Sequence, residues 1–213
     1  MLMWMSASLW AAEPAAANPG TRGRIVVLGD SITAGYGLDP ARAYPALLQQ
    51  KLDQAGLAFE VINAGVSGDT TSGGLRRIDW ALSKGAQVLI VALGGNDGLR
   101  GISPRQTEQN LAGILERARA KIPGIAVIVA GMQMPANMGA KFVEEFSAVF
   151  PRVAEAKHAE LVAFLLEGVG GVSALNQADQ IHPTAEGQKR VAENVWKVLE
   201  KVLNSPGLSV PRS

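Results

Sequence analysis

The stretch "VVLGDSITAGYG", residues 26–37, decides the fold. Its aliphatic run stops at Gly29, and an acid, Asp30, and a hydroxyl, Ser31, follow directly. Short and nearly continuous aliphatic runs are typical of strands that are covered on both faces of a parallel sheet. The stretch therefore predicts a buried strand that ends at Gly29. Ser31 then lies at the carboxyl end of this strand, where a serine either caps the next helix or acts as a nucleophile.

Aliphatic runs of the same kind recur along the chain, and segments with helical spacing separate them. The five runs cover residues 24–28, 58–63, 87–93, 125–130 and 160–164. The helical segments cover residues 44–56, 105–124, 141–158 and 184–203. Pro151 must bend or break the third of these helices, and Thr184 is placed to cap the last one. The alternation predicts an α/β protein with a five-stranded parallel sheet in a three-layer α/β/α sandwich.

Composition narrows the range of functions. Hydrophobic residues make up 47% of the 213 residues and charged residues 18%, which suits one soluble domain with a full core. The formal net charge is +1, and no basic stripe with aromatic residues is present, so we expect no nucleic-acid partner. There is no cysteine, which excludes a thiolate zinc site, a disulfide framework and a cysteine nucleophile.

The two ends of the chain differ from the rest. Residues 1–20 are apolar, then rich in alanine, and "AAA" at 15–17 fits the cleavage rule of a secretory signal, although a positively charged start is missing. We therefore expect a periplasmic or secreted protein. No other stretch approaches the ~20 apolar residues of a membrane span, so stable membrane insertion is not expected. The last residues, 205–213, are rich in Pro, Gly and Ser, and we expect a disordered tail.

Polar residues follow the ends of several predicted strands. Gly68 follows the second strand and Asn96 the third, and either one alone would be an ordinary turn residue. After the fifth strand, His182 stands three residues beyond Asp179. An Asp and a His at this spacing can meet side by side, so that the carboxylate orients the imidazole while the other ring nitrogen faces a serine. Because sites in such sheets lie beyond the carboxyl ends of the strands, these residues favour Ser31 as a nucleophile.

Four blocks in this order resemble the SGNH hydrolases, which are also called GDSL-type esterases. The blocks are "GDSIT", "VSGDT", "GGND" and "DQIH", and the resemblance spans residues 24–203. The wider strings "LGGNDGLRG" and "FLLEGVGGV" look like the bacterial branch with periplasmic acyl-thioesterase, lysophospholipase and arylesterase activities. The resemblance implies a flavodoxin-like SGNH hydrolase domain over residues 21–204, with no cofactor and no metal.

The resemblance also implies a role for each block. Ser31 would attack an acyl carbonyl, His182 would act as the general base, and Asp179 would orient His182. The oxyanion would be held by the backbone N–H groups of Ser31 and Gly68 and by the side-chain amide of Asn96.

Three further positions bear on the site. Asp30 is expected to bind local backbone and stiffen the turn. Ile32 replaces the leucine of the GDSL motif and should point into the core. Met138 stands where that branch often carries an aromatic residue, which puts the substrate preference in doubt but not the chemistry.

The expected partner is a small acyl ester or thioester. Apolar residues in or beside the strand-end loops are the candidates for a substrate pocket: Leu38, Leu99, Met132, Met134, Pro135 and Val169. Such a wall suits an acyl chain or an aromatic ester better than a sugar. The residues leave aryl esters, thioesters and lysophospholipids as open alternatives, and they do not indicate an oligomeric state.

Three other functions fit parts of the pattern. A metallophosphoesterase also carries Asp and Asn at strand ends, but it needs several histidines for two metals, and this chain has two, of which His158 is poorly placed. Loss of esterase activity with EDTA would favour the metallophosphoesterase. A dinucleotide-binding protein would show G-x-G-x-x-G after the first strand, and no such motif follows it in this chain. A non-catalytic lipid or sugar carrier would not need Asp179, His182 and Asn96 together.

Overall fold

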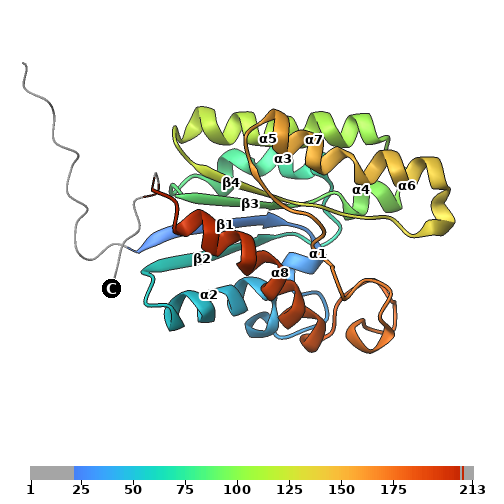
Figure 1. The fold of residues 1–213 in the computed structure, drawn as a ribbon, viewed down its shortest axis with the longest axis horizontal. Coiled ribbons are helices and arrows are strands. Elements are labelled where there is room, and N and C mark those ends of the chain that lie inside the picture. The colour runs from blue at the N-terminus through green and yellow to red at the C-terminus, as the bar shows by residue number, and fades with distance from the viewer. Residues whose placement is uncertain (1–21, 207, 209–213) are drawn as a thin grey trace, which may run out of the picture.

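The computed structural model describes residues 22–206 and 208 (Figure 1). Five parallel strands form one sheet in the order β2-β1-β3-β4-β5, as the sequence predicts. The strands are β1 (Gly23–Gly29), β2 (Phe59–Gly65), β3 (Val88–Ala92), β4 (Ala126–Ala130) and β5 (Glu160–Val162). This order reverses direction between β1 and β3, and the crevice at such a switch point is where doubly wound sheets bind ligands.

The burial of each strand follows its place in the sheet. All five residues of β3 are buried, as are six of the seven residues of β1. The edge strands β2 and β5 are only partly buried, and β2 accordingly carries Glu60 and Asn63 among its apolar residues. The central strands need side chains that are apolar on both faces, which explains their unbroken aliphatic runs.

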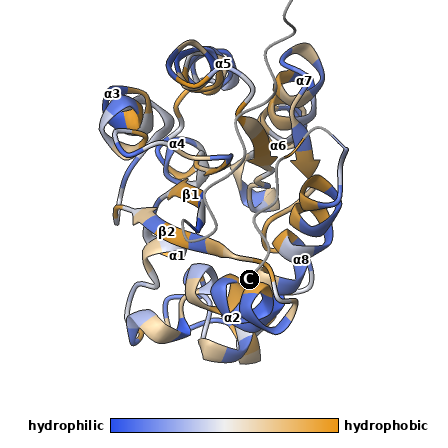
Figure 2. Ribbon diagram, turned by 90° about the vertical axis from the view of Figure 1, so that its left-hand side faces the viewer, coloured by the Kyte–Doolittle hydropathy of each residue, from blue (hydrophilic) through white to orange (hydrophobic). Residues whose placement is uncertain are grey.

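Helices cover both faces of the sheet, which gives the predicted three-layer α/β/α sandwich (Figure 1). One face carries α2 (Tyr44–Gln54) and α8 (Ala185–Leu203). The other face carries α3 (Thr71–Ala81), α5 (Pro104–Lys121) and α7 (Val149–Ala156). Figure 2 shows hydrophobic and hydrophilic residues alternating around these helices, as expected where each buries one side against the sheet.

Shorter elements lie in the loops. They are α1 (Ser31–Ala34), α4 (Gly95–Leu99), α6 (Ala140–Ser147) and the single 3₁₀ turns η1 (Pro40–Arg42), η2 (Ala136–Met138) and η3 (Ser173–Leu175). The predicted break near Pro151 is confirmed, because α6 ends at Ser147 and α7 begins at Val149. A proline at position 151 has no N–H to donate to the carbonyl of residue 147.

The helix α3 is absent from the helical segments that the sequence predicts. Its sequence, TSGGLRRIDWA, contains Gly73 and Gly74, which weaken the intrinsic helix propensity. The helix is started instead by Thr70, whose side chain accepts a hydrogen bond from the backbone N–H of Gly73. Its apolar side packs on the sheet and on α5.

The described end of the chain extends beyond the predicted boundary at residue 204. The backbone N–H of Leu208 donates to the carbonyl of Ser205, and the Leu208 side chain packs against the hydrophobic core. Residues 209–213 of the predicted tail and the predicted signal segment, residues 1–20, lie outside the described residues. Within residues 22–206 and 208, no helix combines the length and the apolar character that crossing a membrane requires.

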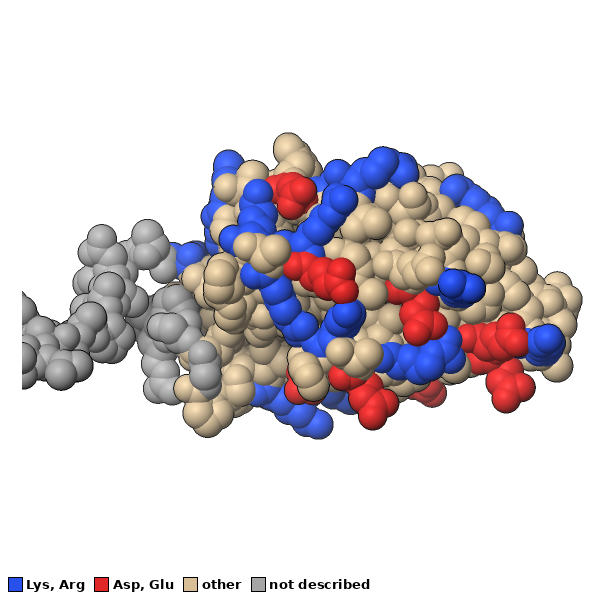
Figure 3. All heavy atoms as spheres, turned by 90° about the horizontal axis from the view of Figure 1, so that it is seen from above, with Lys and Arg blue, Asp and Glu red and all other residues tan. Residues whose placement is uncertain are grey.

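Basic and acidic side chains are interspersed on the face shown in Figure 3. Two ion pairs join α5 to α7 and its C-terminal cap, Arg152–Glu108 at 2.7 Å and Lys157–Glu116 at 2.6 Å. Exposed pairs of this kind contribute about 0–1 kcal/mol each to stability. The mixture of signs agrees with the formal net charge of +1.

Candidate active site

The turn after β1 holds Ser31 at the carboxyl edge of the sheet. Asp30 caps the short helix α1, and its Oδ1 accepts a hydrogen bond from the backbone N–H of Ile32 at 3.0 Å, so the expected role of Asp30 in the turn is confirmed. Gly29 is required here, because a Cβ at this position would lie 1.9 Å from Oγ1 of Thr33. Ile32 is 6% exposed and packs in the core, as predicted.

Ser31, His182 and Asp179 form a chain of hydrogen bonds. Nε2 of His182 lies 2.9 Å from Oγ of Ser31, and Nδ1 of His182 lies 2.6 Å from Oδ2 of Asp179. Both distances fall in the range expected between a nucleophile, a base and the group that orients the base. The structure thus brings Ser31 into contact with His182, which is 151 positions away in the sequence, and His182 into contact with Asp179, which is 3 positions away.

The carboxylate of Asp179 is held by backbone as well as by the imidazole. Its Oδ1 accepts hydrogen bonds from the backbone N–H groups of His182 at 3.0 Å and Ile181 at 2.9 Å. Hydrogen bonds from the His182 backbone and then from its side chain lower the pKa of Asp179 to about 2. A carboxylate that stays ionised can fix the orientation of the imidazole across the neutral pH range.

Tyr36 covers one side of the imidazole, which the sequence patterns did not suggest. The rings of Tyr36 and His182 have centroids 4.5 Å apart and planes tilted by 37°. Nε2 of Gln177 donates to the carbonyl of Tyr36 at 2.8 Å and ties this loop to the one that carries His182. An aromatic residue between two glycines, directly after the serine block, was the available signal.

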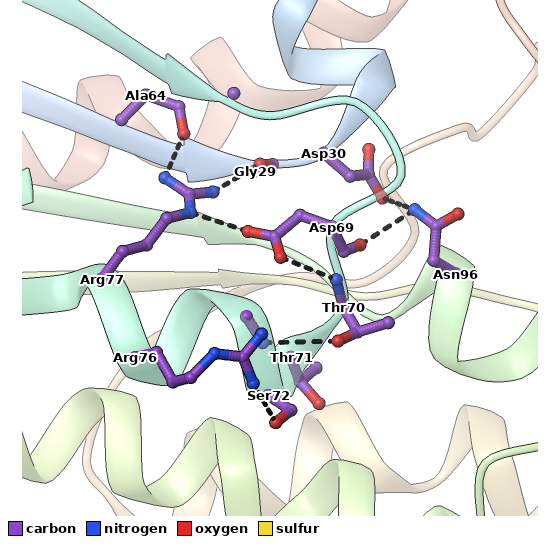
Figure 4. A network of polar contacts seen from close by, with 12 residues as sticks. Gly29, Asp30, Ala64, Asp69, Thr70, Thr71, Ser72, Arg76, Arg77 and Asn96 are labelled. Atoms are coloured by element: carbon purple, nitrogen blue, oxygen red, sulfur yellow. Dashed lines mark hydrogen bonds and ion pairs between the residues drawn. The ribbon is translucent and has the colours of Figure 1, made fainter.

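Gly68 and Asn96, the other two block residues, follow β2 and β3, the two strands that flank β1 in the sheet. Gly68 has a φ of 78°, and its carbonyl accepts a hydrogen bond from Nη2 of Arg100 at 2.9 Å. Nδ2 of Asn96 donates to the backbone carbonyl of Asp69 at 2.9 Å and also lies 3.4 Å from Oδ2 of Asp30 (Figure 4). The backbone of the Gly68 loop and the side chain of Asn96 are therefore linked directly.

Asp97, next to Asn96, fixes α4 to the start of α3. It is fully buried, and Oδ2 accepts the backbone N–H of Thr71 at 2.8 Å, while Oγ1 of Thr71 donates to Oδ1. Nδ2 of Asn110 on α5 donates to the same Thr71 hydroxyl at 3.0 Å. A buried carboxylate with these partners anchors the helix that carries Asn96. Sequence reasoning missed it because Asp97 reads as an ordinary loop acid.

Asp30 should make stability depend on pH. Its side chain is 2% exposed, and burial raises the pKa of this carboxyl from 3.8 to about 6. The folded state therefore favours the protonated form, so the stabilisation is full below pH 3.8 and is lost as the pH rises through about 6. Relative to Asp30→Asn, the wild-type free energy of unfolding should fall by up to about 3 kcal/mol over this interval.

Denaturant unfolding of both proteins at a series of pH values measures this difference. Asp39→Asn is a matched control, because Asp39 also accepts a backbone N–H two residues ahead, that of Ala41 at 2.9 Å, but at an exposed position. Parallel stability profiles for wild type and Asp30→Asn would contradict the prediction.

An apolar cavity of about 390 Å³ opens beside Ser31. Four of the six predicted pocket residues line it: Leu99, Met132, Met134 and Pro135. Ile32 and Gly95, which adjoin Ser31 and Asn96 in the sequence, also line it. Sequence reasoning missed further apolar walls that come from the loop after β5, namely Phe164, Leu166 and Ile181.

Two predicted pocket residues are corrected by the structure. Val169 is fully buried and does not line the cavity, because its loop turns inward, where Nδ2 of Asn176 donates to the Val169 carbonyl at 2.7 Å. Leu38 is half-buried in the turn after α1, where its backbone N–H donates to the Gly35 carbonyl, and it also lies outside the cavity lining.

A second cavity, of about 350 Å³, lies at the opposite, amino-terminal edge of the sheet. Arg119, His158, Glu160 and Lys201 border it. Two guanidinium nitrogens of Arg119 donate to the carbonyls of Lys157 and His158, so this arginine satisfies the end of α7. Across residues 22–206 and 208, no group of three or more His, Asp and Glu side chains is arranged to hold a metal ion.

The fold and the site define a class of protein: a doubly wound α/β protein with a hydrogen-bonded Ser–His–Asp set at the carboxyl edge of its sheet. Residues 27–190 match the model of the GDSL-like lipase/acylhydrolase family, and the chain belongs to this family. It is an ester hydrolase of the GDSL type.

Similar proteins support this assignment. The chain is 47% identical to Esterase TesA of Pseudomonas aeruginosa over 180 residues, which cover 84% of this chain and 89% of the relative. It is 38% identical to Thioesterase 1/protease 1/lysophospholipase L1 of Escherichia coli K12 over 182 residues, covering 84% and 85% of the two chains. A crystal structure of TesA superimposes with a TM-score of 0.81 at 45% identity, over 84% of this chain and 99% of that one.

Proposed function

We propose that the protein is a serine esterase that hydrolyses carboxylic esters through an acyl-enzyme on Ser31. The observation that carries this proposal is the hydrogen-bonded chain from Ser31 through His182 to Asp179, with an apolar cavity beside it. A structural serine that only caps a helix would have no need of an imidazole at 2.9 Å from its hydroxyl.

Ser31, His182 and Asp179 each have a defined role in the proposed reaction. Nε2 of His182 accepts the proton of the Ser31 hydroxyl while Oγ attacks the acyl carbonyl. The imidazolium then donates this proton to the leaving alcohol or thiol, and the acyl group remains on Ser31. Water repeats the sequence in the second half-reaction and releases the acid. Asp179 stays ionised throughout and holds Nδ1–H of His182.

The developing negative charge needs donors at the same edge of the sheet. We assign this role to the backbone N–H groups of Ser31 and Gly68 and to the side-chain amide of Asn96. The hydrogen bonds of the Asn96 amide support the assignment: the one to the Asp69 carbonyl at 2.9 Å holds Nδ2 at this edge of the sheet, and the longer one to Oδ2 of Asp30 at 3.4 Å is the one an oxyanion would replace.

The cavity favours acyl or aryl groups over sugars, since most of its walls are aliphatic, aromatic or methionine side chains. Esters of short-to-medium acyl groups and aryl esters are the proposed substrates, and the relative named thioesterase and lysophospholipase makes acyl-CoA and lysophospholipids the alternative substrates. The signal-like residues 1–20 support a periplasmic or secreted location.

A chain-length profile tests the cavity as the acyl site. Each buried methylene contributes about 0.8 kcal/mol, so kcat/KM on p-nitrophenyl esters should rise about fourfold per carbon until the cavity is full and should then flatten or fall. Leu99→Glu and Met134→Glu should reduce hexanoate hydrolysis much more than acetate hydrolysis. Leu99 is 45% exposed, so Leu99→Glu should also keep the melting temperature of the wild type. Acyl-CoA measured alongside compares thioesters with oxygen esters.

Met138→Glu is the matched control: the sequence suggested that Met138 bears on substrate preference, but the structure places it in η2, in the same segment as Met134 and outside the cavity lining. Its acetate-to-hexanoate ratio should equal that of the wild type. An unchanged ratio in Leu99→Glu would mean that the acyl group binds elsewhere.

A further inference from the structure

Arg77 on α3 connects three backbone segments at the carboxyl edge of the sheet (Figure 4). Its Nη2 donates to the carbonyl of Gly29 at 2.8 Å and its Nη1 to the carbonyl of Ala64 at 2.7 Å. Its Nε donates to Oδ2 of Asp69 at 2.7 Å. All three nitrogens of one planar guanidinium are thus used at once, which a lysine could not reproduce.

Each of these contacts holds a part of the proposed oxyanion hole. The carbonyl of Gly29 belongs to the peptide that leads into Asp30 and Ser31. The carbonyl of Ala64 belongs to the end of β2, just before the loop that carries Gly68. Asp69 lies in that loop, and its own backbone carbonyl accepts the hydrogen bond from Asn96 at 2.9 Å.

The ion pair is shielded and tightly packed. The side chains of Arg77 and Asp69 are 18% and 12% exposed. A Cβ at Gly73 would lie 1.6 Å from Oδ1 of Asp69, so the carboxylate sits directly on the first turn of α3. Charge-assisted hydrogen bonds in such a place are short and directional, and they fix geometry better than exposed pairs do.

We propose that Arg77 and Asp69 are positioning residues that set the relative placement of Ser31, Gly68 and Asn96, and so keep the oxyanion donors aligned. This inference rests on the proposed function. Neither side chain is assigned a contact with substrate; they act through the backbone of the nucleophile turn and through the carbonyl that orients Asn96.

Arg77→Gln tests the proposal against Arg76→Gln. Arg76 is the neighbouring arginine on the same helix, but it is exposed and donates only to Oγ of Ser72 at 2.9 Å (Figure 4). Arg77→Gln should lower kcat on a p-nitrophenyl ester by about 100-fold and change KM by less than about threefold, because misplaced donors weaken binding of the transition state rather than of the substrate. Arg77→Lys should recover part of the loss, and Arg76→Gln should match the wild type.

A double-mutant cycle with Asn96→Ala separates positioning from a general structural role. If Arg77 acts through Asn96, the double variant should lose little more activity than Asn96→Ala alone. The proposal would be overturned if the fold-losses in kcat of Arg77→Gln and Asn96→Ala multiplied in full in the double variant, or if Arg77→Gln changed only KM. Should Arg77→Gln fail to fold, Arg77→Lys and Asp69→Asn carry the same cycle.

A measurement without turnover keeps this inference distinct from the proposed function. The side-chain amide signal of Asn96 in a ¹⁵N NMR spectrum, assigned by its loss in Asn96→Ala, should shift in Arg77→Gln and stay in place in Arg76→Gln. An unmoved signal in Arg77→Gln would overturn the positioning role. Ester hydrolysis that survives Ser31→Ala would instead overturn the proposed function, whatever the NMR spectrum shows.

Discussion

Ser31→Ala should lower kcat for ester hydrolysis by about four orders of magnitude or more, because the acyl-enzyme can no longer form. The Ser31 hydroxyl has one side-chain hydrogen-bond contact, with Nε2 of His182, so the free energy of unfolding should change by no more than about 1 kcal/mol. Hydrolysis of p-nitrophenyl butyrate and the melting temperature measure the two effects separately.

Labelling by a fluorophosphonate gives a second reading of the same prediction. The wild type should take up one label, at Ser31, and Ser31→Ala should take up none. Ser83→Ala is the control, because Ser83 is an exposed serine on the same chain, and it should label like the wild type. A label on any other serine would contradict the assignment of the nucleophile.

The sheet could be predicted from the sequence because its central strands are buried on both faces. Such strands leave runs like VLIVA, which differ from the surrounding helices in length and composition. The helix α3 could not be predicted in this way. Two glycines lower its intrinsic propensity, and although the cap from Thr70 is local, the packing on α5 that stabilises the helix depends on the fold.

The polar residues of the site were accessible to sequence reasoning for a related reason. Parallel strands bring their carboxyl ends to one edge, so Ser31, Gly68 and Asn96 had to lie near one another once the strands were assigned. The cavity walls do not follow from this rule. Val169 and Phe164 belong to the same loop after β5, and only the path of that loop buries the first and turns the second toward the cavity.

The supporting residues were the hardest to find, because each acts on a backbone group rather than on another functional side chain. Arg77 lies on the helix that the sequence did not predict, and its partners are two carbonyls and Asp69. Every residue type has a backbone carbonyl, so the sequence does not show which carbonyls an arginine will bind. A motif therefore identifies Ser31 but not the arginine that orients its turn.

Asp179→Asn should reduce kcat by about 10⁴-fold while leaving the turn intact. The asparagine oxygen can still accept the backbone N–H groups of Ile181 and His182, which Oδ1 of Asp179 accepts at 2.9 Å and 3.0 Å. Its NH₂ group, however, would donate to Nδ1 of His182, so the ring proton would move to Nε2 and face Ser31. An imidazole in that tautomer cannot take the serine proton.

The low pKa of Asp179 means that the comparison of wild type with Asp179→Asn does not depend on the assay pH in the neutral range. Because hydrogen bonds from His182 lower this pKa to about 2, the wild-type carboxylate stays ionised in any assay above about pH 4. The difference between wild type and Asp179→Asn should therefore persist across the whole neutral range. Asp39→Asn is the control, since Asp39 is another exposed aspartate that accepts a backbone N–H, that of Ala41. If Asp179→Asn kept the wild-type kcat, Tyr36 and the surrounding loop would have to orient His182 without the carboxylate.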